Sequence, residues 1–314
     1  YPVRDAEGVW VSVARPAAFT TRAADATEAA ALAYLVAFDL GRFDLGFALG
    51  TDHPRVGWSP RVPAAGRDAR PGPDGFATVE PFVRTGQLAP SLQPRIAAVF
   101  TGGFKREHGA FRYGEFAAVE NGSHYGFVEH GVVFSRLVPG LATLFVDIDG
   151  TVRMKTWDAA DGRRLAEVRD ARQNGVPLVE RGAPGALVDQ WGPGNWSGSA
   201  DARLRTLRAG ACIVDGVAGN GRRFLVYGWF SSTTPRTMAE VFVGYRCSYA
   251  MHLDMNALEH TYLALFVRAG DRIEIEHLVA GMAALDPRTD GGVLPRFVGV
   301  PDDRDFFYLL KRDR

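Results

Sequence analysis

The sequence predicts an α+β fold, a single domain around a mixed or largely antiparallel sheet with few helices. Short segments of strand length, either apolar or alternating with period two, recur along the chain. Clusters of glycine, proline, asparagine and aspartate separate them, and one segment alone carries a clear helix start. No stretch of linker composition and no internal repeat divides the chain. We therefore treat residues 1–314 as one domain, with terminal extensions packed on it.

The first third of the chain is predicted to contain mainly strands. An alanine-rich tract at 23–31 predicts a short helix, and "AYLVAFDLGRFDLGFALG" then predicts two strands around Gly41-Arg42. Residues 60–75 are a loop by composition, because proline and glycine recur through them. "PRIAAVF" predicts a buried strand that ends in two glycines, and "YGFVEHGVVFS" continues the strand-rich pattern.

The stretch "LATLFVDIDGTVRMKTW" has two interpretations. An apolar strand running into Asp-x-Asp-Gly-Thr resembles the nucleophile motif of haloacid-dehalogenase phosphatases, with Asp147 as nucleophile. That mechanism needs a helix after the loop, but residues 151–157 alternate apolar and polar and predict a second strand. Two strands joined across Asp149-Gly150 are a strong hairpin signal. A hairpin is therefore the prediction, with metal binding by Asp147 and Asp149 as the minor alternative.

The second half continues this pattern and contains the clear helix. Residues 158–169 fit a helix, and "RAGACIVDG" with "RRFLVYGWF" predicts a hairpin. Thr234 followed by Pro235 is typical of an N-cap and first turn, and Gly244 is a plausible helix stop. Further strands are predicted at "YAMHLDMN", "TYLALFVRAG", "RIEIEHLV" and "DFFYLLK".

Composition excludes some classes of protein. The chain has 36 basic and 36 acidic side chains, so its net charge gives no reason to expect nucleic-acid binding. No apolar run reaches the ~18 residues of a membrane span. The alanine-, arginine- and glycine-rich composition is typical of bacterial proteins. Cys212 and Cys247 fit either a disulfide or two buried thiols, and the sequence leaves both open.

The segment "FTGGFKREHGAFRYG" is the first candidate for a binding site. Gly102 and Gly103 at the end of a strand allow close approach of a ligand or of another backbone. Lys105 and His108 follow, and basic groups beside exposed N–H groups suit a phosphate. The alternative is a glycine-rich turn with solvated charges.

The segment "AMHLDMNALEHTYLALF" places four polar groups between two apolar strands. Asp254, Asn256, Glu259 and His260 are costly there unless they are bonded or face a cleft. Asp254 and Asn256 point the same way if the strand continues through both. A polar hairpin loop is the alternative.

Three further segments add candidates for ligand binding. The hydroxyl cluster in "VYGWFSSTTPRT" enters the predicted helix, whose N-terminus suits an anion, although one hydroxyl is explained by capping. "ARQNGVPLVERG" and the strand near 208 offer hydrogen-bonding groups, and "WGPGNWSG" offers tryptophans for stacking on a sugar. The candidates are Thr233, Thr234, Asn174, Arg208, Trp191 and Trp196.

The order of these blocks resembles the phosphodiester glycosidase domain family. The blocks are strand–Gly-Gly-Phe–His-Gly, Arg-Gln-Asn with Pro-Leu, an arginine-containing strand, and Leu-Asp-x-Asn before a final strand pair. The resemblance covers roughly residues 30–268. In one branch of that family the Leu-Asp block continues with glycines and serines. Here it reads Leu253-Asp254-Met255-Asn256, which is similar to a bacterial branch with a different substrate.

The resemblance implies a hydrolase that cleaves a sugar–phosphate linkage at the anomeric C–O bond. It makes Asp254 the first choice of catalytic carboxylate and Glu259 the second, with His108 and His260 as proton carriers or phosphate ligands. The groups expected to hold phosphate are Arg208, Lys105, the backbone at Gly102-Gly103 and the helix start at Thr234. We expect these segments to line one cleft.

The resemblance also predicts the binding partners. The substrate is a carbohydrate or a glycosyl phosphate, and no cofactor is required, although Asp254 and Asn256 offer oxygen ligands for a divalent cation. A secreted or cell-envelope location is expected, with a cytoplasmic one as the alternative. Nothing in the sequence indicates an oligomeric state. The rival functions are a phosphodiesterase or phosphatase that cuts P–O, and a non-catalytic carbohydrate-binding domain.

Overall fold

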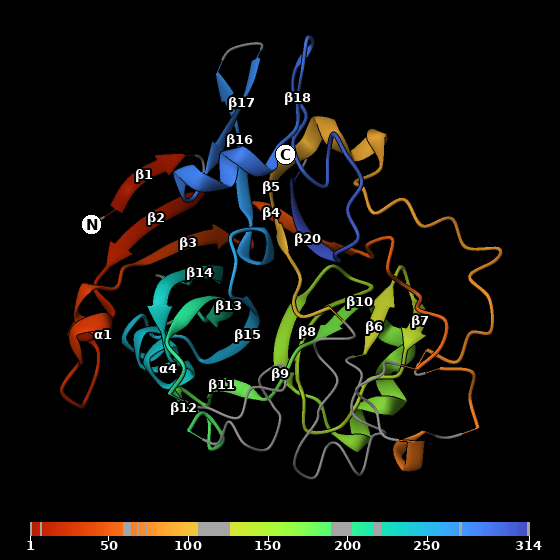
Figure 1. Ribbon diagram of the computed structural model, residues 1–314, viewed down its shortest axis with the longest axis horizontal. Coiled ribbons are helices and arrows are strands. Elements are labelled where there is room, and N and C mark those ends of the chain that lie inside the picture. Colours follow the sequence, from red (N-terminus) through yellow and green to blue (C-terminus); the bar gives the residue numbers. More distant parts are fainter. Residues whose placement is uncertain are drawn as a thin grey trace.

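The computed structural model describes residues 2–6, 8–58, 64–67, 69–72, 74–105, 126–189, 203–216, 221–269 and 272–312. Three sheets surround the centre of the molecule, and a small fourth sheet projects from it (Figure 1). Every pairing between the named strands of the described part is antiparallel. The sheet-dominated, largely antiparallel architecture with few helices is therefore confirmed.

The largest sheet, here called sheet A, has eight strands. The predicted hairpin of "RAGACIVDG" and "RRFLVYGWF" forms its middle, where ladder bonds join residues 206–214 to 224–233. In spatial order the strands are β1 (Pro2–Ala6), β2 (Val9–Ala14), β3 (Ala33–Asp39), β14 (Phe224–Thr233), β13 (Thr206–Val214), β15 (Tyr249–Met255), β11 (Pro177–Glu180) and β12 (Ala183–Pro184).

Sheets B and C have five strands each. Sheet B contains, in order, β17 (Arg272–His277), β16 (Leu263–Ala269), β5 (Ile96–Thr101), β20 (Phe306–Lys311) and β4 (Phe43–Ala48). Sheet C contains β7 (Val132–Ser135), β6 (Phe127–Glu129), β10 (Val168–Gln173), β8 (Ala142–Asp147) and β9 (Val152–Thr156). The small sheet pairs β18 (Arg288–Thr289) with β19 (Gly292–Val293).

The turn at Gly41-Arg42 connects two sheets rather than closing a hairpin. The two predicted strands exist, but β3 pairs in sheet A whereas β4 pairs with β20 in sheet B. One cluster of buried apolar side chains extends across all three sheets and includes Phe38, Phe100 and Leu144. The side chains of "PRIAAVF" from Ile96 onwards are buried, as predicted for this strand. The sheets therefore share one core.

The hairpin interpretation of "LATLFVDIDGTVRMKTW" is confirmed. β8 and β9 pair antiparallel with Val146 opposite Val152, and Gly150 takes a positive φ of 84° in the turn. The Asp147 carboxylate lies 2.5 Å from Arg153 Nε, on the facing strand. No helix follows the Asp149-Gly150 turn, so the phosphatase interpretation of Asp147 is wrong.

Two of the three predicted helices form α-helices. Helix α4 (Pro235–Gly244) begins after Thr234, whose side chain accepts from the Thr237 N–H. Helix α1 (Ala26–Ala30) lies in the alanine-rich tract and is capped by Asp25. The other helices in the described part are 3-10 helices at Pro16–Ala18, Ala64–Gly66, Pro90–Arg95, Ala159–Glu167, Glu259–Thr261 and Ala280–Leu285, and the fourth of them lies in the predicted helical segment 158–169. In the described part no helix is long and apolar enough to cross a membrane.

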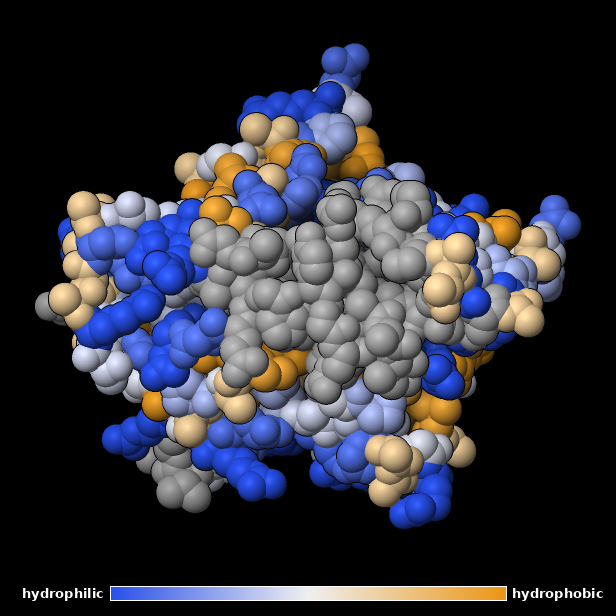
Figure 2. Space-filling view, turned by 60° about the horizontal axis from the view of Figure 1, so that its bottom comes forward, coloured by the Kyte–Doolittle hydropathy of each residue, from blue (hydrophilic) through white to orange (hydrophobic). Residues whose placement is uncertain are grey.

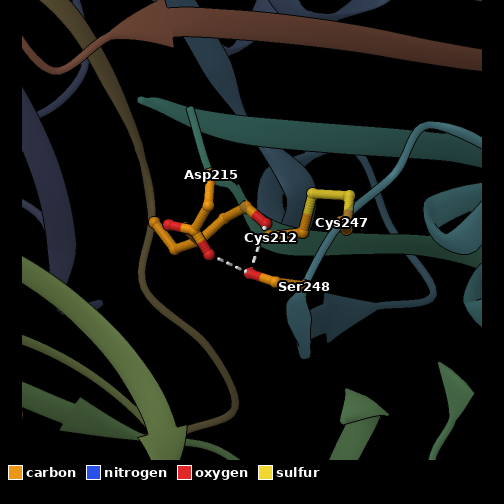
Figure 3. The surroundings of a disulfide bond; sticks show 5 residues. Cys212, Asp215, Cys247 and Ser248 are labelled. Carbon is orange, nitrogen blue, oxygen red and sulfur yellow. Dashed lines mark hydrogen bonds between the residues drawn. A yellow bond between two sulfur atoms is a disulfide. The ribbon is translucent and has the colours of Figure 1, made fainter. Parts of the chain in front are cut away.

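Cys212 and Cys247 form a disulfide, which decides between the two alternatives. The bond joins β13 to the segment after α4, with a Cα–Cα distance of 5.8 Å (Figure 3). Beside it Ser248 Oγ donates to Asp215 Oδ2 at 2.6 Å and to the carbonyl of Ile213 at 3.2 Å. The disulfide therefore fixes the C-terminal end of α4 to the middle of sheet A.

Removing this disulfide should lower stability. The cross-link closes a segment with a sequence separation of 35, and restricting such a loop in the unfolded chain stabilises the fold by about 3–4 kcal/mol. We expect a Cys212→Ala/Cys247→Ala variant to lose an amount of that order in urea unfolding. Treatment with a reductant should destabilise the wild type but leave the variant unchanged. Equal sensitivity of both to the reductant would contradict the prediction.

The surface in Figure 2 shows hydrophilic residues around small, separate hydrophobic patches. Scattered apolar residues of this kind are ordinary for a folded protein. Among the described residues the exposed large apolar side chains include Val83, Ile148 and Ile273, which belong to different parts of the chain.

Candidate functional site

A buried polar cluster lies where the three sheets meet. The segment after β5, the end of β10, the end of β15 and the residues just before β20 all contribute to it. These are the segments that carry the Gly-Gly, Arg-Gln-Asn and Leu-Asp blocks of the sequence. We call this the junction cluster and define it by Arg172, Asn174, Asp254, Arg304 and Asp305.

Arg172 is the centre of the junction cluster. Its side chain is fully buried, and its guanidinium binds both carboxylate oxygens of Asp305, at 2.8 and 3.3 Å. Nη2 also donates to the Phe104 carbonyl at 2.7 Å, and the guanidinium lies 4.7 Å from the Phe127 ring centroid. Arg172 therefore connects sheet C to two segments of sheet B.

Asn174 connects the same point to sheet A. Its Oδ1 accepts from the Phe104 N–H at 3.2 Å and from Arg172 Nη1 at 3.1 Å. Its Nδ2 donates to the carbonyls of His252 and Leu253, at 2.7 and 2.5 Å. The side chain is fully buried. Asn174 therefore holds β15 in place, and its side-chain groups are all used within the protein.

Gly102 and Gly103 are required because protein groups approach them. A Cβ on Gly102 would lie 2.1 Å from Asp305 Oδ2, and one on Gly103 would lie 2.7 Å from Asn174 Oδ1. The Gly102 N–H donates to the Asp305 carbonyl at 2.9 Å. The close approach predicted from the sequence is therefore present, and in the described part it is made by the junction cluster.

Asp254 enters the cluster from β15 and pairs with Arg304. The distance from Asp254 Oδ2 to Arg304 Nη1 is 2.5 Å, and Oδ1 accepts from the Met255 N–H at 2.8 Å. Both side chains are almost completely buried. Burial raises the pKa of Asp254, and the charges of Arg304, His260 and Arg172 oppose that rise.

Arg208 lies on β13, opposite Met255 of the neighbouring strand β15. Its Nε donates to the Thr233 carbonyl at 2.9 Å, and its Nη1 lies 3.2 Å from both His252 Nε2 and Met255 Sδ. Burial lowers the pKa of Arg208 to about 9. The Thr233 hydroxyl is buried and has no hydrogen-bond partner among the described residues. It is therefore a polar group available to a ligand.

His252 is held neutral by this environment. Its Nδ1 lies 3.1 Å from the Leu253 carbonyl and its Nε2 lies 3.2 Å from Arg208, so Nδ1 carries the hydrogen and Nε2 accepts. Burial, and then the charge of Arg208, lower the pKa of His252 well below 6.5. Protonation would place two positive charges side by side at a buried position.

This histidine should make the fold sensitive to acid. Because the folded-state pKa is depressed, the contribution is present above about pH 6.5 and is lost as pH falls through the folded pKa. We expect His252→Gln, whose amide can accept from Arg208, to flatten the loss of unfolding free energy below about pH 6.5. The matched control is His130→Gln at an exposed turn, which should keep the wild-type slope. An unchanged slope in His252→Gln would contradict the assignment.

Lys105 lies at the edge of the junction cluster. Its ammonium group pairs with Asp303 and lies 3.8 Å from Asp52. Asp303 directly precedes Arg304 in the chain, and Arg304 is the partner of Asp254. The Lys105–Asp303 ion pair is therefore adjacent to the Arg304–Asp254 ion pair. The Lys105 ammonium group thus lies at the edge of the junction cluster, where it already faces the carboxylates of Asp303 and Asp52.

The start of helix α4 already holds a carboxylate. The buried Glu28 accepts from Thr237 Oγ1 at 2.6 Å, and Arg22 Nη2 lies 3.3 Å from the same oxygen. Thr234 caps the helix and its hydroxyl lies 3.4 Å from Glu28. The chain's own Glu28 therefore occupies the helix start where the sequence predicts an anion, and Thr234 as a phosphate contact stays a prediction.

The segment after Asp254 separates into two parts. His260 Nδ1 lies 2.8 Å from the Met255 carbonyl, and its Nε2 lies 2.9 Å from the exposed Glu259. β15 ends at Met255 and Asn256 takes a positive φ of 79°, so the strand does not continue as the shared-face prediction required. Asp254 is buried, whereas Asn256 is exposed and accepts from Thr206. The proposed cation pair of Asp254 and Asn256 is thus separated.

The described chain also gives no other indication of a metal centre. No group of three or more histidine, cysteine, aspartate or glutamate side chains within the described residues could hold a metal ion. Three predicted site residues, His108, Trp191 and Trp196, lie outside the described residues. Of the predicted site residues in the described part, Gly102, Gly103, Asn174 and Asp254 lie around Arg172, and Arg208 contacts His252 on the same strand as Asp254. That they line one cleft stays a prediction.

Sequence reasoning missed several residues of the cluster. Arg172 belongs to the Arg-Gln-Asn block, but only Asn174 of that block is among the predicted site residues. Arg304, Asp305 and His252 are not among them. His53 lies 3.9 Å from Asp305 and stacks near Phe127. A usable signal existed in Arg172-Gln173-Asn174, because three polar residues ending a strand between apolar segments are costly to bury. For His53 the sequence offers no such signal.

Comparisons with known proteins leave the family open. No family model matches the sequence, and no curated protein matches it. The structure is similar to the catalytic domain of zebrafish N-acetylglucosamine-1-phosphodiester alpha-N-acetylglucosaminidase, auto-inhibited by its pro-peptide. That match has 10% identity and a TM-score of 0.45, and it covers 98% of this chain and 82% of that one. A hypothetical protein from Synechocystis matches with 10% identity and a TM-score of 0.44, over 98% of this chain and 62% of that one. These similarities are too distant to assign an activity.

Proposed function

We propose that this chain is a hydrolase of glycosyl phosphodiesters that cleaves the anomeric C–O bond. The observation that carries the proposal is the convergence of three separated sequence blocks in one cluster. Hydrogen bonds of Arg172 and Asn174 join the Gly102–Phe104 segment, the Arg-Gln-Asn block and the Leu253-Asp254 block. These are the blocks whose order resembles the phosphodiester glycosidase domain family.

The charge of the cluster suits a phosphodiester. The junction cluster contains the guanidinium groups of Arg172 and Arg304 and the carboxylates of Asp254 and Asp305, and the buried Arg208 on the neighbouring strand β13 is counted with them. Three positive groups less two negative groups leave an excess of one positive charge. A phosphodiester carries one negative charge, so its binding would neutralise the site. The buried Thr233 hydroxyl beside Arg208 offers a further hydrogen bond.

The proposed step uses Asp254 as a general base. Its carboxylate takes a proton from water while the water oxygen bonds to the anomeric carbon. The electron pair of the C–O bond leaves with the phosphate oxygen, whose developing charge is stabilised by the arginines. Because the departing phosphate monoester is already a good leaving group, a strong general acid is less necessary than in ordinary glycosidases. The products are a free sugar and a phosphate monoester.

Hydrolysis in heavy-oxygen water tests this function directly. A panel of glycosyl phosphodiesters would be incubated with the protein, and the products analysed by mass spectrometry. We expect the label in the sugar, because water attacks carbon. Label in the phosphate would instead establish P–O cleavage by a phosphodiesterase. Saturable sugar binding without turnover across the panel would support a non-catalytic carbohydrate-binding domain and contradict the proposal.

We further propose that the reaction needs no divalent cation and takes place in an oxidising compartment. The first part follows from the use of buried arginines as the positive charges of the cluster. The second is consistent with the Cys212–Cys247 disulfide, since such bonds persist in extracytoplasmic compartments. Turnover should be unchanged by a chelator. Its loss on chelation and recovery on adding a divalent cation would contradict the first part.

A further inference from the structure

A cavity lined partly by arginines lies at the far end of the sheets from the junction cluster. Its volume is about 360 Å³, within the usual range of small-ligand sites. It is lined by residues 39–41 after β3, 150–152 in the β8–β9 turn, 221–223 before β14, and Arg312. We call it the arginine cavity. Because Asp305 precedes β20 and Arg312 follows it, the two sites are separated by the length of a strand, roughly 20 Å.

Arg222 is held in the arginine cavity by aromatic rings. Its guanidinium carbon lies 5.2 Å from the Trp10 ring centroid and 5.7 Å from that of Phe224. Its Nη1 lies 3.7 Å from Asp39 Oδ2, which is beyond hydrogen-bond distance. Cation–π contacts of this kind fix the side chain without using its N–H donors. The donors of Arg222 therefore remain available to a ligand.

Arg223 and Arg312 are also held in position with donors to spare. Arg223 donates through Nε to Asp215 at 2.9 Å and through Nη1 to the Val152 carbonyl at 2.5 Å. Arg312 donates through Nε to Asp44 at 2.8 Å. Each guanidinium carries five N–H donors in a fixed plane, so further donors of both remain within the described chain. Three arginines whose side chains are held by other contacts thus line one cavity.

The donors of this lining suit an oxyanion with several acceptor oxygens. Three arginines and one carboxylate, that of Asp39, line the cavity. Asp215 and Asp44 bind Arg223 and Arg312 from outside the lining, so the charges of the three arginines and their three carboxylate partners balance, and recognition rests on the N–H donors that remain. A phosphate monoester presents three strong acceptor oxygens, whereas a carboxylate presents two.

The glycines of the lining keep the space open. Gly150 and Gly221 both take a positive φ of 84°, and a Cβ built on either meets no atom within 4 Å. These turn conformations favour glycine, and the absence of side chains leaves backbone facing the cavity. The cavity therefore forms where three turns, at residues 39–41, 150–152 and 221–223, lie side by side.

We propose that the arginine cavity is a binding site for a phosphate dianion. The ligand is either inorganic phosphate or the terminal phosphate of a small phosphomonoester, which share the recognised group. The guanidinium groups of Arg222, Arg223 and Arg312 bind its oxygens, and Asp39 limits the affinity by like-charge repulsion. The site is independent of the proposed hydrolysis, because none of its residues belongs to the junction cluster.

Calorimetric titration tests this site with inorganic phosphate and, separately, with glycerol phosphate. We expect Arg222→Gln/Arg312→Gln to weaken binding by about tenfold or more for each charged contact removed. The matched control is Arg272→Gln, an exposed arginine on β17, which should bind like the wild type. Tighter binding of glycerol phosphate than of phosphate would identify a phosphomonoester as the ligand, and the reverse order would identify free phosphate.

Asp39→Asn provides a test of opposite sign. The amide oxygen can still accept from the Gly41 N–H, as Asp39 Oδ1 does at 2.9 Å, while the negative charge is removed. We expect phosphate to bind several-fold more tightly to this variant. Phosphate held at the junction cluster would be unaffected by all of these substitutions. Unchanged affinity in both variants, or no binding up to about 10 mM phosphate, would overturn the proposal.

Discussion

Asp254→Asn should reduce turnover of a glycosyl phosphodiester by about 10³-fold while substrate binding survives within about tenfold. The substitution keeps the size of the side chain but removes the negative charge that accepts a proton from water. That charge acts mainly in the transition state, so kcat should fall far more than affinity. Steady-state kinetics would measure kcat, and titration would measure the affinity for the substrate, so the two effects can be separated.

The same substitution should also lower stability, and this must be measured separately. Asp254 accepts from Arg304 with one oxygen and from the Met255 N–H with the other. An asparagine has a single side-chain acceptor, so its amide NH₂ must face one of these donors. Leaving a buried donor unsatisfied costs about 1–3 kcal/mol. The rate should therefore be expressed per folded molecule.

Asp170→Asn is the matched control for this cost. Asp170 is buried on β10 and has the same pattern of contacts, with Arg169 Nε on one oxygen at 2.8 Å and the His130 N–H on the other at 3.0 Å. We expect a similar loss of stability and a rate within a few-fold of wild type. If both variants lost turnover equally, the effect would be structural.

Near-normal turnover in folded Asp254→Asn would reject Asp254 as the base. The next candidate would be Glu259, whose carboxylate lies 2.9 Å from His260 Nε2. Glu259 is exposed, so it lacks the buried cationic neighbours that surround Asp254. Loss of turnover in Glu259→Gln but not in Asp254→Asn would then move the catalytic group to the surface of the junction.

The fold was largely predictable because its signals are local. The Asp149-Gly150 turn, the Thr234 cap and the apolar run at Ile96–Thr101 each depend on neighbouring residues, and the structure confirms all three. The partition into sheets depends on distant pairings. The turn at Gly41-Arg42 has the same local character whether its strands pair with each other or join two sheets. Sequence patterns of this length cannot distinguish those outcomes.

The site was only partly predictable for the same reason. Asp254 could be identified because a carboxylate within an apolar strand is costly, and that cost is visible in the sequence. The groups that compensate it are Arg304, 50 residues away, and Arg172. Arg304 lies in a run of charged residues before β20, where the sequence pattern is equally typical of an exposed loop. Only the tertiary structure shows that this run is partly buried.

Arg172→Met should be among the most destabilising single substitutions in the protein. Arg172 is fully buried and binds both oxygens of Asp305, the Phe104 carbonyl and Asn174. Methionine fills part of the volume but leaves the Asp305 carboxylate buried without its main partner. Removing one partner of a buried ion pair costs about 3–5 kcal/mol. Urea unfolding monitored by circular dichroism would measure this loss.

A double-mutant cycle with Asp305→Asn separates the ion pair from simple packing. If the cost of Arg172→Met comes from the stranded carboxylate, then neutralising Asp305 in the same chain should recover part of it. We expect the double variant to be more stable than the sum of the single losses predicts, by more than about 1 kcal/mol. Strict additivity would mean that the two side chains act independently. The junction of the three sheets would then depend on the carbonyl and ring contacts of Arg172 rather than on its charge.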